Sequence, residues 1–241
     1  MLFEVIHEDC NLLVINKPAG LVCHPTKGDE LSSLISRARL HLKENFTAHL
    51  VNRLDRETSG VILIAKNSEA AGELGKIWEC RAVQKEYAAI VHGYIREKSG
   101  VIDAPLGKDV QSAVAIKDCV RADGAAAQTE FELVKNFTRD DQNFSLLRLI
   151  PRTGRKHQIR IHLAHIGHPI VGDKLYGHDE DAYLALVENR LSNEHRDKLI
   201  LPFQALHARS LCFKWRDSEW KFSAQSEDWF QTFTRDAIRS F

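Results

Sequence analysis

The first half of the chain alternates short apolar runs with charged or turn-forming segments. Apolar and polar positions alternate from Leu2 to Ile6, and continuous apolar runs follow at Leu12 to Ile15 and at Val61 to Ala65. Short runs of this kind, bounded by Asn, Pro or Gly, are typical of β-strands. The segments His49 to Val51 and Tyr87 to Val91 are predicted as two further strands.

Helical spacing of apolar residues marks other segments. Glu30 to Leu42 carries its apolar residues on one face and predicts an amphipathic helix, and Ser68 is placed to cap a helix running to about Arg81. Arg155 to Ile166 is predicted as a helix, although an apolar alternation within it leaves a strand possible. The remaining predictions are helices at Asp181 to Leu191 and Asp228 to Ile238, and strands at Val114 to Ile116, Thr129 to Val134, Phe144 to Leu149 and Leu206 to Phe213.

This order of elements lacks the regular strand-helix-strand alternation of a doubly wound sheet. We therefore expect an α+β fold with a mixed, mainly antiparallel sheet and flanking helices. A chain of 241 residues fits one large domain or two small ones. The sequence contains no internal repeat and no low-complexity linker. Its least regular part is Ile95 to Asp123.

Composition narrows the classes of protein that remain. Hydrophobic residues make up 44% and charged residues 27%, which excludes a disordered chain. The 33 basic and 33 acidic residues balance, so a nucleic-acid partner would need a local basic patch. Five scattered cysteines without a Cys-x-x-Cys pair indicate reduced thiols, and no signal peptide or membrane-spanning stretch is recognisable. These features predict a cytoplasmic protein.

The polar segment Asn52 to Gly60 lies between two predicted strands and contains Arg53, Asp55, Arg56 and Glu57. A loop held at both ends by core strands is a rigid platform for a reactive group. Nearby arginines favour the ionised form of a carboxylate, so Asp55 is a candidate nucleophile or base. A surface turn with structural ion pairs explains the same composition equally well.

A local basic patch lies between Arg148 and Lys174. This segment holds six Lys or Arg residues and four histidines but one acid, Asp173. Thr153 and Gly154 precede the predicted helix, and the backbone N–H groups at a helix N-terminus favour phosphate. The patch therefore predicts contact with RNA or another phosphate-bearing partner.

The histidines of this patch also permit a metal site, because His162 and His165 are close on a helical face. The acid that usually accompanies such histidines, as in His-Glu-x-x-His, is missing, so no metal is expected. The sequence likewise lacks a phosphate-binding P-loop, a dinucleotide fingerprint and a Gly-x-Ser-x-Gly elbow. Nucleotide hydrolysis, dinucleotide redox chemistry and serine hydrolysis are therefore disfavoured.

Several separated motifs follow one another along the chain. They are Asn16-Lys17-Pro18-Ala19-Gly20, Arg53-Leu54-Asp55-Arg56-Glu57-Thr58-Ser59-Gly60, Lys85-Glu86-Tyr87, the run Thr153 to His162, and Gly167-His168-Pro169-Ile170-Val171-Gly172-Asp173. In this order they resemble the motifs of the RluA family of RNA pseudouridine synthases, and the resemblance is collinear from about Phe3 to Leu211. Several motifs in the right order identify a family more specifically than any single motif does. They imply a pseudouridine-synthase-like single domain over residues 1–241 with a central catalytic cleft.

The resemblance also implies the chemistry. Uridine in RNA is isomerised to pseudouridine without a cofactor or metal: the glycosidic bond breaks, uracil rotates, and C5 joins C1′. Asp55 matches the essential aspartate, Tyr87 the active-site tyrosine, and Arg160 the basic residue that pairs with the aspartate. Arg53 matches an arginine that helps displace the target nucleotide. Further RNA contacts are expected in the basic patch, from Arg155, Lys156, His157 and Gln158.

The chain departs from the family pattern at one position. Asn52 stands where a histidine usually precedes the Arg-Leu-Asp motif, and an altered substrate contact is the expected consequence. The first motif begins within about twenty residues of the start, so no N-terminal S4 domain is expected. RNA choice would then depend on the catalytic domain and a short single-stranded or loop target.

The sequence leaves the function open between classes. The leading hypothesis is a pseudouridine synthase that acts on ribosomal or transfer RNA, as a monomer without a membrane partner. The alternative is a noncatalytic RNA-binding or ribosome-assembly factor on the same scaffold, suggested by Asn52 and the basic patch. A metal-dependent hydrolase that uses the histidines is a weaker third hypothesis.

Overall fold

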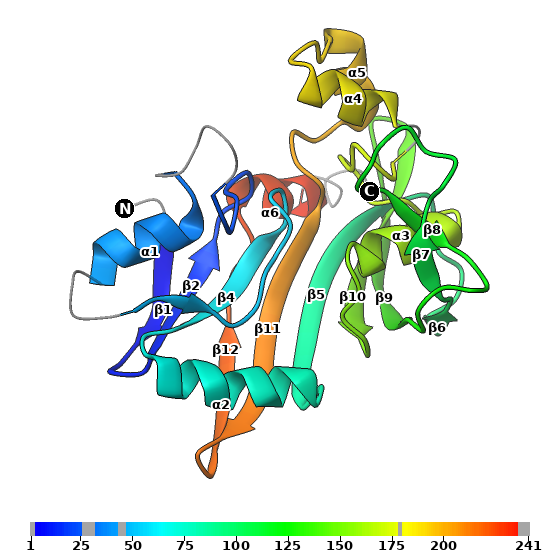
Figure 1. The fold of residues 1–241 in the computed structure, drawn as a ribbon. Helices are drawn as coiled ribbons and strands as arrows, with labels where there is room; N and C mark the ends of the chain where they lie inside the picture. Colours follow the sequence, from blue (N-terminus) through cyan, green and yellow to red (C-terminus); the bar gives the residue numbers. More distant parts are fainter. Residues whose placement is uncertain (1–2, 26–31, 43–46, 178–179, 236–241) are drawn as a thin grey trace. The chain divides into compact units, whose positions relative to one another are not determined.

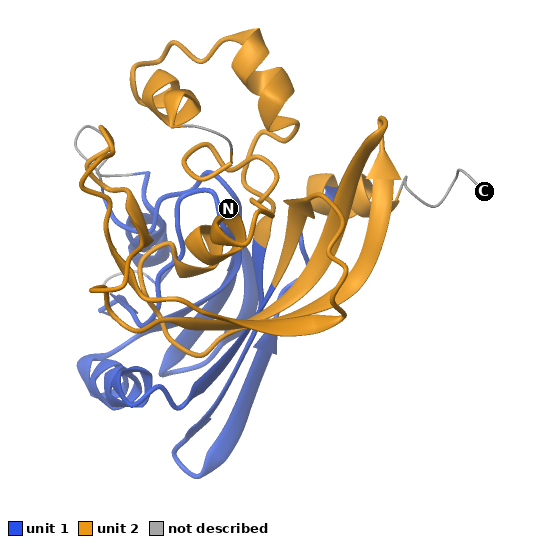
Figure 2. Cartoon of the chain, turned by 90° about the vertical axis from the view of Figure 1, so that its right-hand side faces the viewer, with its two compact units in different colours: residues 1–87, 207–228 blue, residues 88–206, 229–241 orange. Residues whose placement is uncertain are grey.

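The computed structural model describes residues 3–25, 32–42, 47–177 and 180–235 (Figure 1). The chain forms two compact units (Figure 2). Unit 1 comprises Met1–Tyr87 and His207–Asp228, and unit 2 comprises Ala88–Leu206 and Trp229–Phe241. The strand β5 (Val83–His92) begins in unit 1 and continues into unit 2.

The sheet of unit 1 is built around the strand β4 (Ser59–Ala65). Antiparallel partners of β4 are β2 (Leu12–Lys17) and β3 (His49–Leu50), whereas β11 (Leu206–Trp215) runs parallel to it. The outer strands β1 (Glu4–Glu8) and β12 (Ser218–Ser223) pair antiparallel with β2 and β11. One parallel pair among antiparallel ones makes this sheet mixed and mainly antiparallel, as predicted.

The apolar runs of β2 and β4 are buried on both faces, which explains why they are continuous rather than alternating. Leu13 and Ile15 face the helix α1 (Leu34–Leu42), which buries its own apolar side chains against them. Leu12 and Val14 face the opposite way and pack with α2 (Ser68–Glu79) and β11. Alternate residues of one strand thus serve two separate cores.

Gly60 is required where β4 pairs with β11. Its φ is +116°, and a Cβ there would lie 2.2 Å from the carbonyl oxygen of Ala208. Only glycine allows the two backbones to approach so closely. The 52–60 segment therefore ends at a residue whose backbone is held by close pairing with β11.

Unit 2 contains a second antiparallel arrangement. β9 (Gln128–Arg139) and β10 (Gln142–Pro151) form a long hairpin, and β6 (Ser99–Asp103) pairs with the other edge of β9. The short strands β7 (Leu106–Lys108) and β8 (Asp118–Val120) form a separate two-stranded sheet. The helix α3 (Gln158–His165) packs Ile161 against Leu106 and Ala127.

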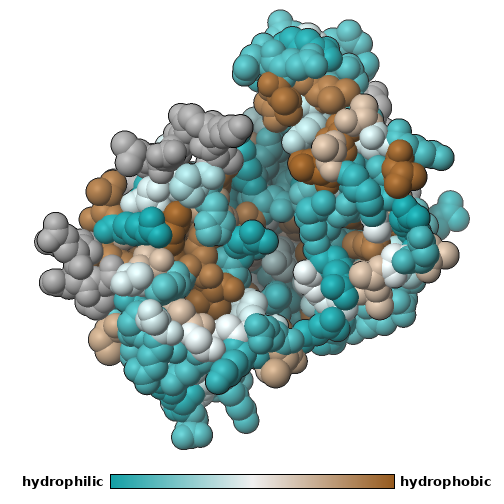
Figure 3. Space-filling model, viewed as in Figure 1, coloured by the Kyte–Doolittle hydropathy of each residue, from teal (hydrophilic) through white to brown (hydrophobic). Residues whose placement is uncertain are grey.

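The remaining helices lie at the margins of unit 2. α4 (Asp181–Val187) and α5 (Asn193–Leu199) follow one another, and the surface over them is mostly hydrophilic (Figure 3). α6 (Asp228–Arg235) lies almost wholly in unit 2, where Phe233 packs against Phe137 and Phe144. No helix in the described ranges is both long and apolar enough to cross a membrane.

Several predictions of single elements were wrong or displaced. The segment 114–116 forms a turn rather than a strand, with the Lys117 N–H donating to the Val114 carbonyl. α2 is capped by the side chain of Asn67, and Ser68 is its first residue. α3 begins at Gln158, not Arg155, because the preceding residue, His157, has a left-handed backbone with φ of +55°. Of the predicted helix ends, residues 30–31 and 236–238 lie outside the described residues.

Candidate functional site

The 52–58 loop of unit 1 connects β3 with β4. The side chain of its first residue, Asn52, anchors the loop to β4. The Asn52 amide oxygen accepts the Leu63 N–H at 2.8 Å, and its amide nitrogen donates to the Val61 carbonyl at 3.3 Å. The Val51 N–H also donates to Leu63. Asn52 therefore continues the pairing with β4 where β3 ends. The amide of Asn52 thus holds the loop to β4. The altered substrate contact expected at this position stays a prediction.

A buried lysine holds the middle of the loop. Lys17, at the end of β2, is fully buried, and its ammonium donates to the carbonyls of Pro18, Leu21 and Arg56 at 2.9, 2.9 and 3.0 Å. The three hydrogens of the ammonium match these three acceptors. Because Arg56 directly follows Asp55, Lys17 fixes the backbone beside the candidate reactive group.

Other contacts tie the 52–58 loop to the same segment. The Gly20 N–H donates to the Arg56 carbonyl at 2.9 Å, and the Cys23 thiol donates to the Leu54 carbonyl at 3.2 Å. The Thr58 N–H donates to the Asp55 carbonyl at 3.2 Å, which closes a turn around Asp55. The backbone is therefore held on both sides of Asp55.

The charges in this region act on one another. Burial lowers the pKa of Lys17 to about 8, while the charges of Cys23, Glu227 and Asp55 oppose that change. Burial, and then the charge of Asp55, raise the pKa of the Tyr87 hydroxyl. Tyr87 therefore remains protonated at neutral pH and can donate a hydrogen bond. Asp55 is partly buried, whereas Arg53 is exposed.

In unit 2, Arg160 is buried on α3 and forms a bidentate ion pair with Asp173. Its Nε lies 2.6 Å and its Nη2 2.9 Å from the two carboxylate oxygens. Asp173 also accepts the N–H groups of Leu175 and Tyr176. Although burial alone would raise the pKa of Asp173, Arg160 and these N–H groups hold it below its usual range. The predicted pairing of Arg160 with Asp55 stays a prediction.

The predicted RNA contacts of unit 2 differ in exposure. Arg155 and Lys156 are exposed, and His157 is partly buried. Gln158 is buried: its amide oxygen accepts from Thr153 and Arg155, and its amide nitrogen donates to the Gln128 carbonyl and the Thr129 hydroxyl. These four hydrogen bonds use every donor and acceptor position of the amide. The amide of Gln158 therefore has a structural task, and the predicted RNA contact at this position stays a prediction.

Two histidines of unit 2 are held by hydrogen bonds. The Nδ1 of His162 lies 2.9 Å from the Thr129 hydroxyl, and its Nε2 lies 2.9 Å from the Ala104 carbonyl. The Nδ1 of His168 lies 2.8 Å from the His92 carbonyl. Within the described ranges, no group of three or more potential ligand residues is placed to bind a metal ion. His162 is thus engaged on both ring nitrogens.

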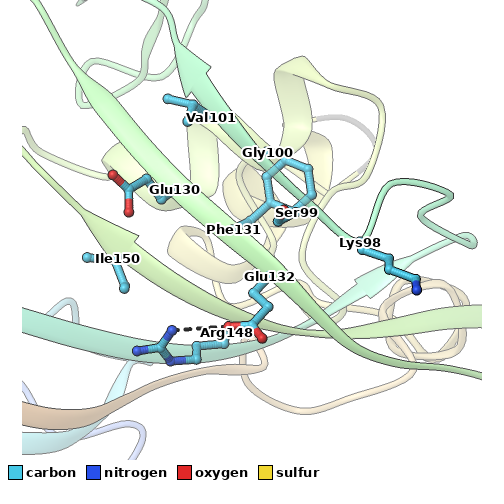
Figure 4. A pocket seen from close by; sticks show the side chains of 9 residues that line it. All are labelled: Lys98, Ser99, Gly100, Val101, Glu130, Phe131, Glu132, Arg148 and Ile150. Carbon is cyan, nitrogen blue, oxygen red and sulfur yellow. Dashed lines mark hydrogen bonds and ion pairs between the residues drawn. The ribbon is translucent and has the colours of Figure 1, made fainter.

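A cavity of about 510 Å³ lies over β6, β9 and β10 in unit 2 (Figure 4). Its lining includes the Phe131 ring and the ion pair of Arg148 with Glu132, whose atoms lie 3.1 Å apart. None of the predicted catalytic or RNA-binding residues lines it. The predicted residues therefore lie on the 52–58 loop, on β5, on α3 and on the segment before α3, and not at this cavity.

Sequence reasoning missed the tasks of two residues. The family motifs that contain Lys17 and Asp173 do not show a role for either residue. A signal for Asp173 existed, because it is the one acid among the basic residues from Arg148 to Lys174. For Lys17, the corresponding signal was a lysine that follows, after one asparagine, the continuous apolar run from Leu12 to Ile15.

Comparison with known proteins identifies the family. Residues 11–165 match the family model described as RNA pseudouridylate synthase. The dual-specificity RNA pseudouridine synthase RluA of Yersinia pestis is 36% identical over 209 residues, covering 86% of this chain and 90% of that protein. The tRNA pseudouridine synthase C of Haemophilus ducreyi is 39% identical over 187 residues, covering 73% and 75% of the two chains.

Further relatives are longer than this chain. The ribosomal large subunit pseudouridine synthase D of Nitrosomonas europaea is 36% identical over 214 residues, which cover 86% of this chain but 57% of that protein. The chain likewise spans only 56 to 61% of three other curated relatives. Among solved structures, human RNA pseudouridylate synthase domain containing 4 superposes with a TM-score of 0.70 at 28% identity, covering 95% and 90% of the chains. The chain belongs to the RNA pseudouridylate synthase family and, within it, to the RluA family.

Proposed function

We propose that this protein is an RNA pseudouridine synthase that isomerises uridine in ribosomal or transfer RNA. Family membership gives the reaction class, and the named relatives act on RNA of these kinds. The observation that carries the proposal is the fixed backbone on both sides of Asp55, with the protonated Tyr87 within its electrostatic reach. A reactive carboxylate needs such a rigid support.

The reaction breaks the C1′–N1 bond of uridine and forms a C1′–C5 bond. N1 gains a proton, and the hydrogen of C5 is released to solvent, so the reaction needs no oxidant or co-substrate. Asp55 would act as nucleophile on the sugar or the ring, or as the base that removes a sugar proton. Tyr87 would hold the detached uracil with its ring and its hydroxyl hydrogen.

Three further assignments complete the proposal. Arg160 would pair with Asp55 as the family pattern implies, and the exposed Arg53 would help to displace the target nucleotide. Arg155, Lys156 and His157 would contact the RNA backbone. The two units would then act together as one catalytic domain on an unpaired uridine.

The release of the C5 hydrogen provides the test. RNA labelled with tritium at C5 of uridine is prepared from cells that lack this protein, and tritium release is measured with the purified full-length chain. The wild-type protein should release tritium, and Asp55→Asn should lower the rate by at least about 10³-fold, because the carboxylate is the reacting group. No release above background by the wild-type protein, from ribosomal or transfer RNA, would contradict the proposal.

A noncatalytic role in RNA binding or ribosome assembly is separated by complementation. The argument for it from Asn52 is weaker now that this amide pairs with the backbone of β4. If Asp55→Ala restores every phenotype of a deletion strain, binding is the function and catalysis is secondary. If the variant fails although it is folded and bound to RNA, catalysis is required.

A further inference from the structure

Tyr176, which follows Asp173 in unit 2, contacts two parts of that unit at once. Its ring lies under the guanidinium of Arg160, with 5.0 Å between the guanidinium carbon and the ring centroid. Its hydroxyl lies 3.0 Å from Nδ1 of His157 and accepts the Asp118 N–H at 3.2 Å. Burial raises the pKa of this hydroxyl, so it stays protonated at neutral pH. The side chain thus offers its face to one partner and its polar end to two others.

Asp173 fixes the geometry on the arginine side. Its carboxylate binds Arg160 in bidentate fashion and also accepts the backbone N–H of Tyr176 at 3.0 Å. The preceding Gly172 has a φ of +79°, and a Cβ there would lie 2.3 Å from the Phe203 carbonyl oxygen. Asp173 therefore binds the edge of the Arg160 guanidinium, and the ring of Tyr176 covers the face of the same group.

The hydroxyl end leads to the exposed basic segment. His157 directly precedes α3 and belongs to the proposed RNA contacts. Asp118, whose backbone N–H donates to Tyr176, forms an ion pair through its side chain with Lys156, at 2.8 Å. The Tyr176 hydroxyl thus contacts His157 directly and is linked to Lys156 through Asp118.

We propose that Tyr176 is a positioning residue that couples Arg160 to the proposed RNA contacts at Lys156 and His157. The inference rests on the proposed function, since it concerns how that site is organised. RNA bound by Lys156 and His157 fixes the position of the Tyr176 hydroxyl, and the ring of the same side chain orients Arg160. If Tyr176 only filled space, losing its hydroxyl would not change KM for the RNA.

Tyr176→Phe tests the hydroxyl alone, because it keeps the ring under Arg160. In the tritium-release assay with full-length protein, KM for the labelled RNA should rise by about two- to tenfold, the factor expected for one hydrogen bond, with kcat within about twofold of wild type. Tyr94→Phe is the matched control: Tyr94 lies in the same unit, and its hydroxyl bonds to Thr138 away from Arg160. This control should leave both constants unchanged.

Tyr176→Leu removes the ring as well and should lower kcat by a further tenfold or so, because Arg160 loses the face that orients it. A double-mutant cycle of Tyr176→Phe with His157→Ala should be non-additive in KM, since the two side chains share one hydrogen bond. Additive effects, or a fall in kcat without a change in KM for Tyr176→Phe, would overturn the inference.

The outcomes separate this inference from the proposed function. If the wild-type protein and Tyr94→Phe release tritium while Tyr176→Phe matches them in KM and kcat, the coupling is wrong and the function stands. If none of the three proteins releases tritium, the proposed function itself is wrong. Urea denaturation of each variant shows whether a fall in kcat reflects a loss of folded protein.

Discussion

The two units hold their functional side chains by different means. In unit 1, one buried ammonium, that of Lys17, binds three backbone carbonyls and so fixes the main chain beside Asp55. In unit 2, side chains hold side chains: Asp173 and Tyr176 enclose Arg160, and the amide of Gln158 joins β9 to the turn before α3. The first anchor is a single charge, and the second is a distributed network.

This difference determines how each anchor fails. The Lys17 ammonium is fully buried and donates to three carbonyls at once, so removing it takes a donor from three acceptors together. In the network of unit 2, several partners of Gln158 lie near solvent; Arg155 is exposed and Thr153 partly exposed. Water can replace part of what Gln158 provides. Unit 1 should therefore be more sensitive to a single substitution.

Lys17→Met should give the largest effect. The methionine keeps an apolar stem of similar length but leaves the carbonyls of Pro18 and Leu21 without this donor, and the Arg56 carbonyl with only the Gly20 N–H. If each carbonyl that loses its donor costs about 1–3 kcal/mol, the free energy of unfolding should fall by about 3 kcal/mol or more. Tritium release should fall as well, because the backbone beside Asp55 is no longer fixed.

Gln158→Met is the matched variant in unit 2. It removes the four hydrogen bonds of the amide but should cost only about 1–2 kcal/mol, since water reaches the Arg155 and Thr153 partners. Urea denaturation with a common m-value measures both variants. Equal losses for the two variants would show that the distributed network is as vulnerable as the single charge.

The central strands of unit 1 could be predicted because their sequence carries the signal of burial on both faces. The run from Leu12 to Ile15 and that from Val61 to Ala65 are continuous and apolar, which few structures other than central strands require. The position of the loop that holds Asp55 follows from these two strands. The family motifs added predicted roles for Asp55, Tyr87 and Arg160, which no periodicity could supply.

The strands that were missed lack such signals. β12 follows the turn at Arg216 and Asp217 and was missed. β9 and β10 were predicted, but too short at the ends that meet at Asp140 and Asp141; all four turn residues have positive φ without being glycine. A sequence pattern that looks for Gly or Asn-Gly does not detect these turns. The strands β6 to β8 are short and partly polar, and their pairing depends on residues distant in the sequence.

The position of buried polar side chains was the least predictable part of the site. Gln158, Arg160 and His162 alternate with apolar residues, yet all three are buried on α3. Their partners include Thr129 in β9, Ala104 and Asp173, which lie between 13 and 58 residues away in the sequence. A helical pattern alone cannot show which polar residue of a helix will meet such partners.

Asn52→Leu should have the next largest effect, because it breaks the first anchor of the 52–58 loop without touching Lys17. Leucine removes the acceptor for the Leu63 N–H and the donor to the Val61 carbonyl, and the free energy of unfolding should fall by about 1–2 kcal/mol. Asn52→His, which installs the residue common in the family, should lose less because imidazole can both donate and accept. Urea denaturation compares the two, and equal losses would contradict this role for the amide.

Acidification should weaken both units. Burial lowers the pKa of His207 in unit 1 and of His162 in unit 2 below the ordinary value of 6.5. Between the folded pKa and 6.5 the unfolded chain binds protons that the folded chain does not, so stability is complete above pH 6.5 and falls as the pH decreases below it. Urea midpoints measured from pH 8 to pH 5 should show this decline.

The two histidines can be separated by substitution. His207→Gln and His162→Gln should each reduce the decline below pH 6.5, because glutamine does not titrate. His207 contacts the Ser59 hydroxyl at the start of β4, and His162 contacts Thr129 in β9. A decline that neither substitution reduces would show that other groups cause the acid sensitivity.

Lys156→Ala should have the smallest effect on stability and a specific effect on RNA binding. The Lys156 side chain is 49% exposed in its ion pair with Asp118, and exposed pairs of this kind contribute less than about 1 kcal/mol. If Lys156 contacts a phosphate, the slope of log affinity against log salt should become shallower by about 0.7 to 0.9. The measurement uses bulk transfer RNA and the Asp55→Asn background, in which catalysis does not interfere.

Lys198→Ala is the control for this prediction. Lys198 is also an exposed lysine in an ion pair, 2.8 Å from Glu194 on α5, but it lies outside the proposed RNA contacts. Its removal should leave the salt slope unchanged and should affect stability as little as Lys156→Ala does. The same change of slope in both variants would show that bulk RNA binds by overall charge. A change confined to Lys156 would place an RNA phosphate beside α3, at the end of the network that holds Arg160.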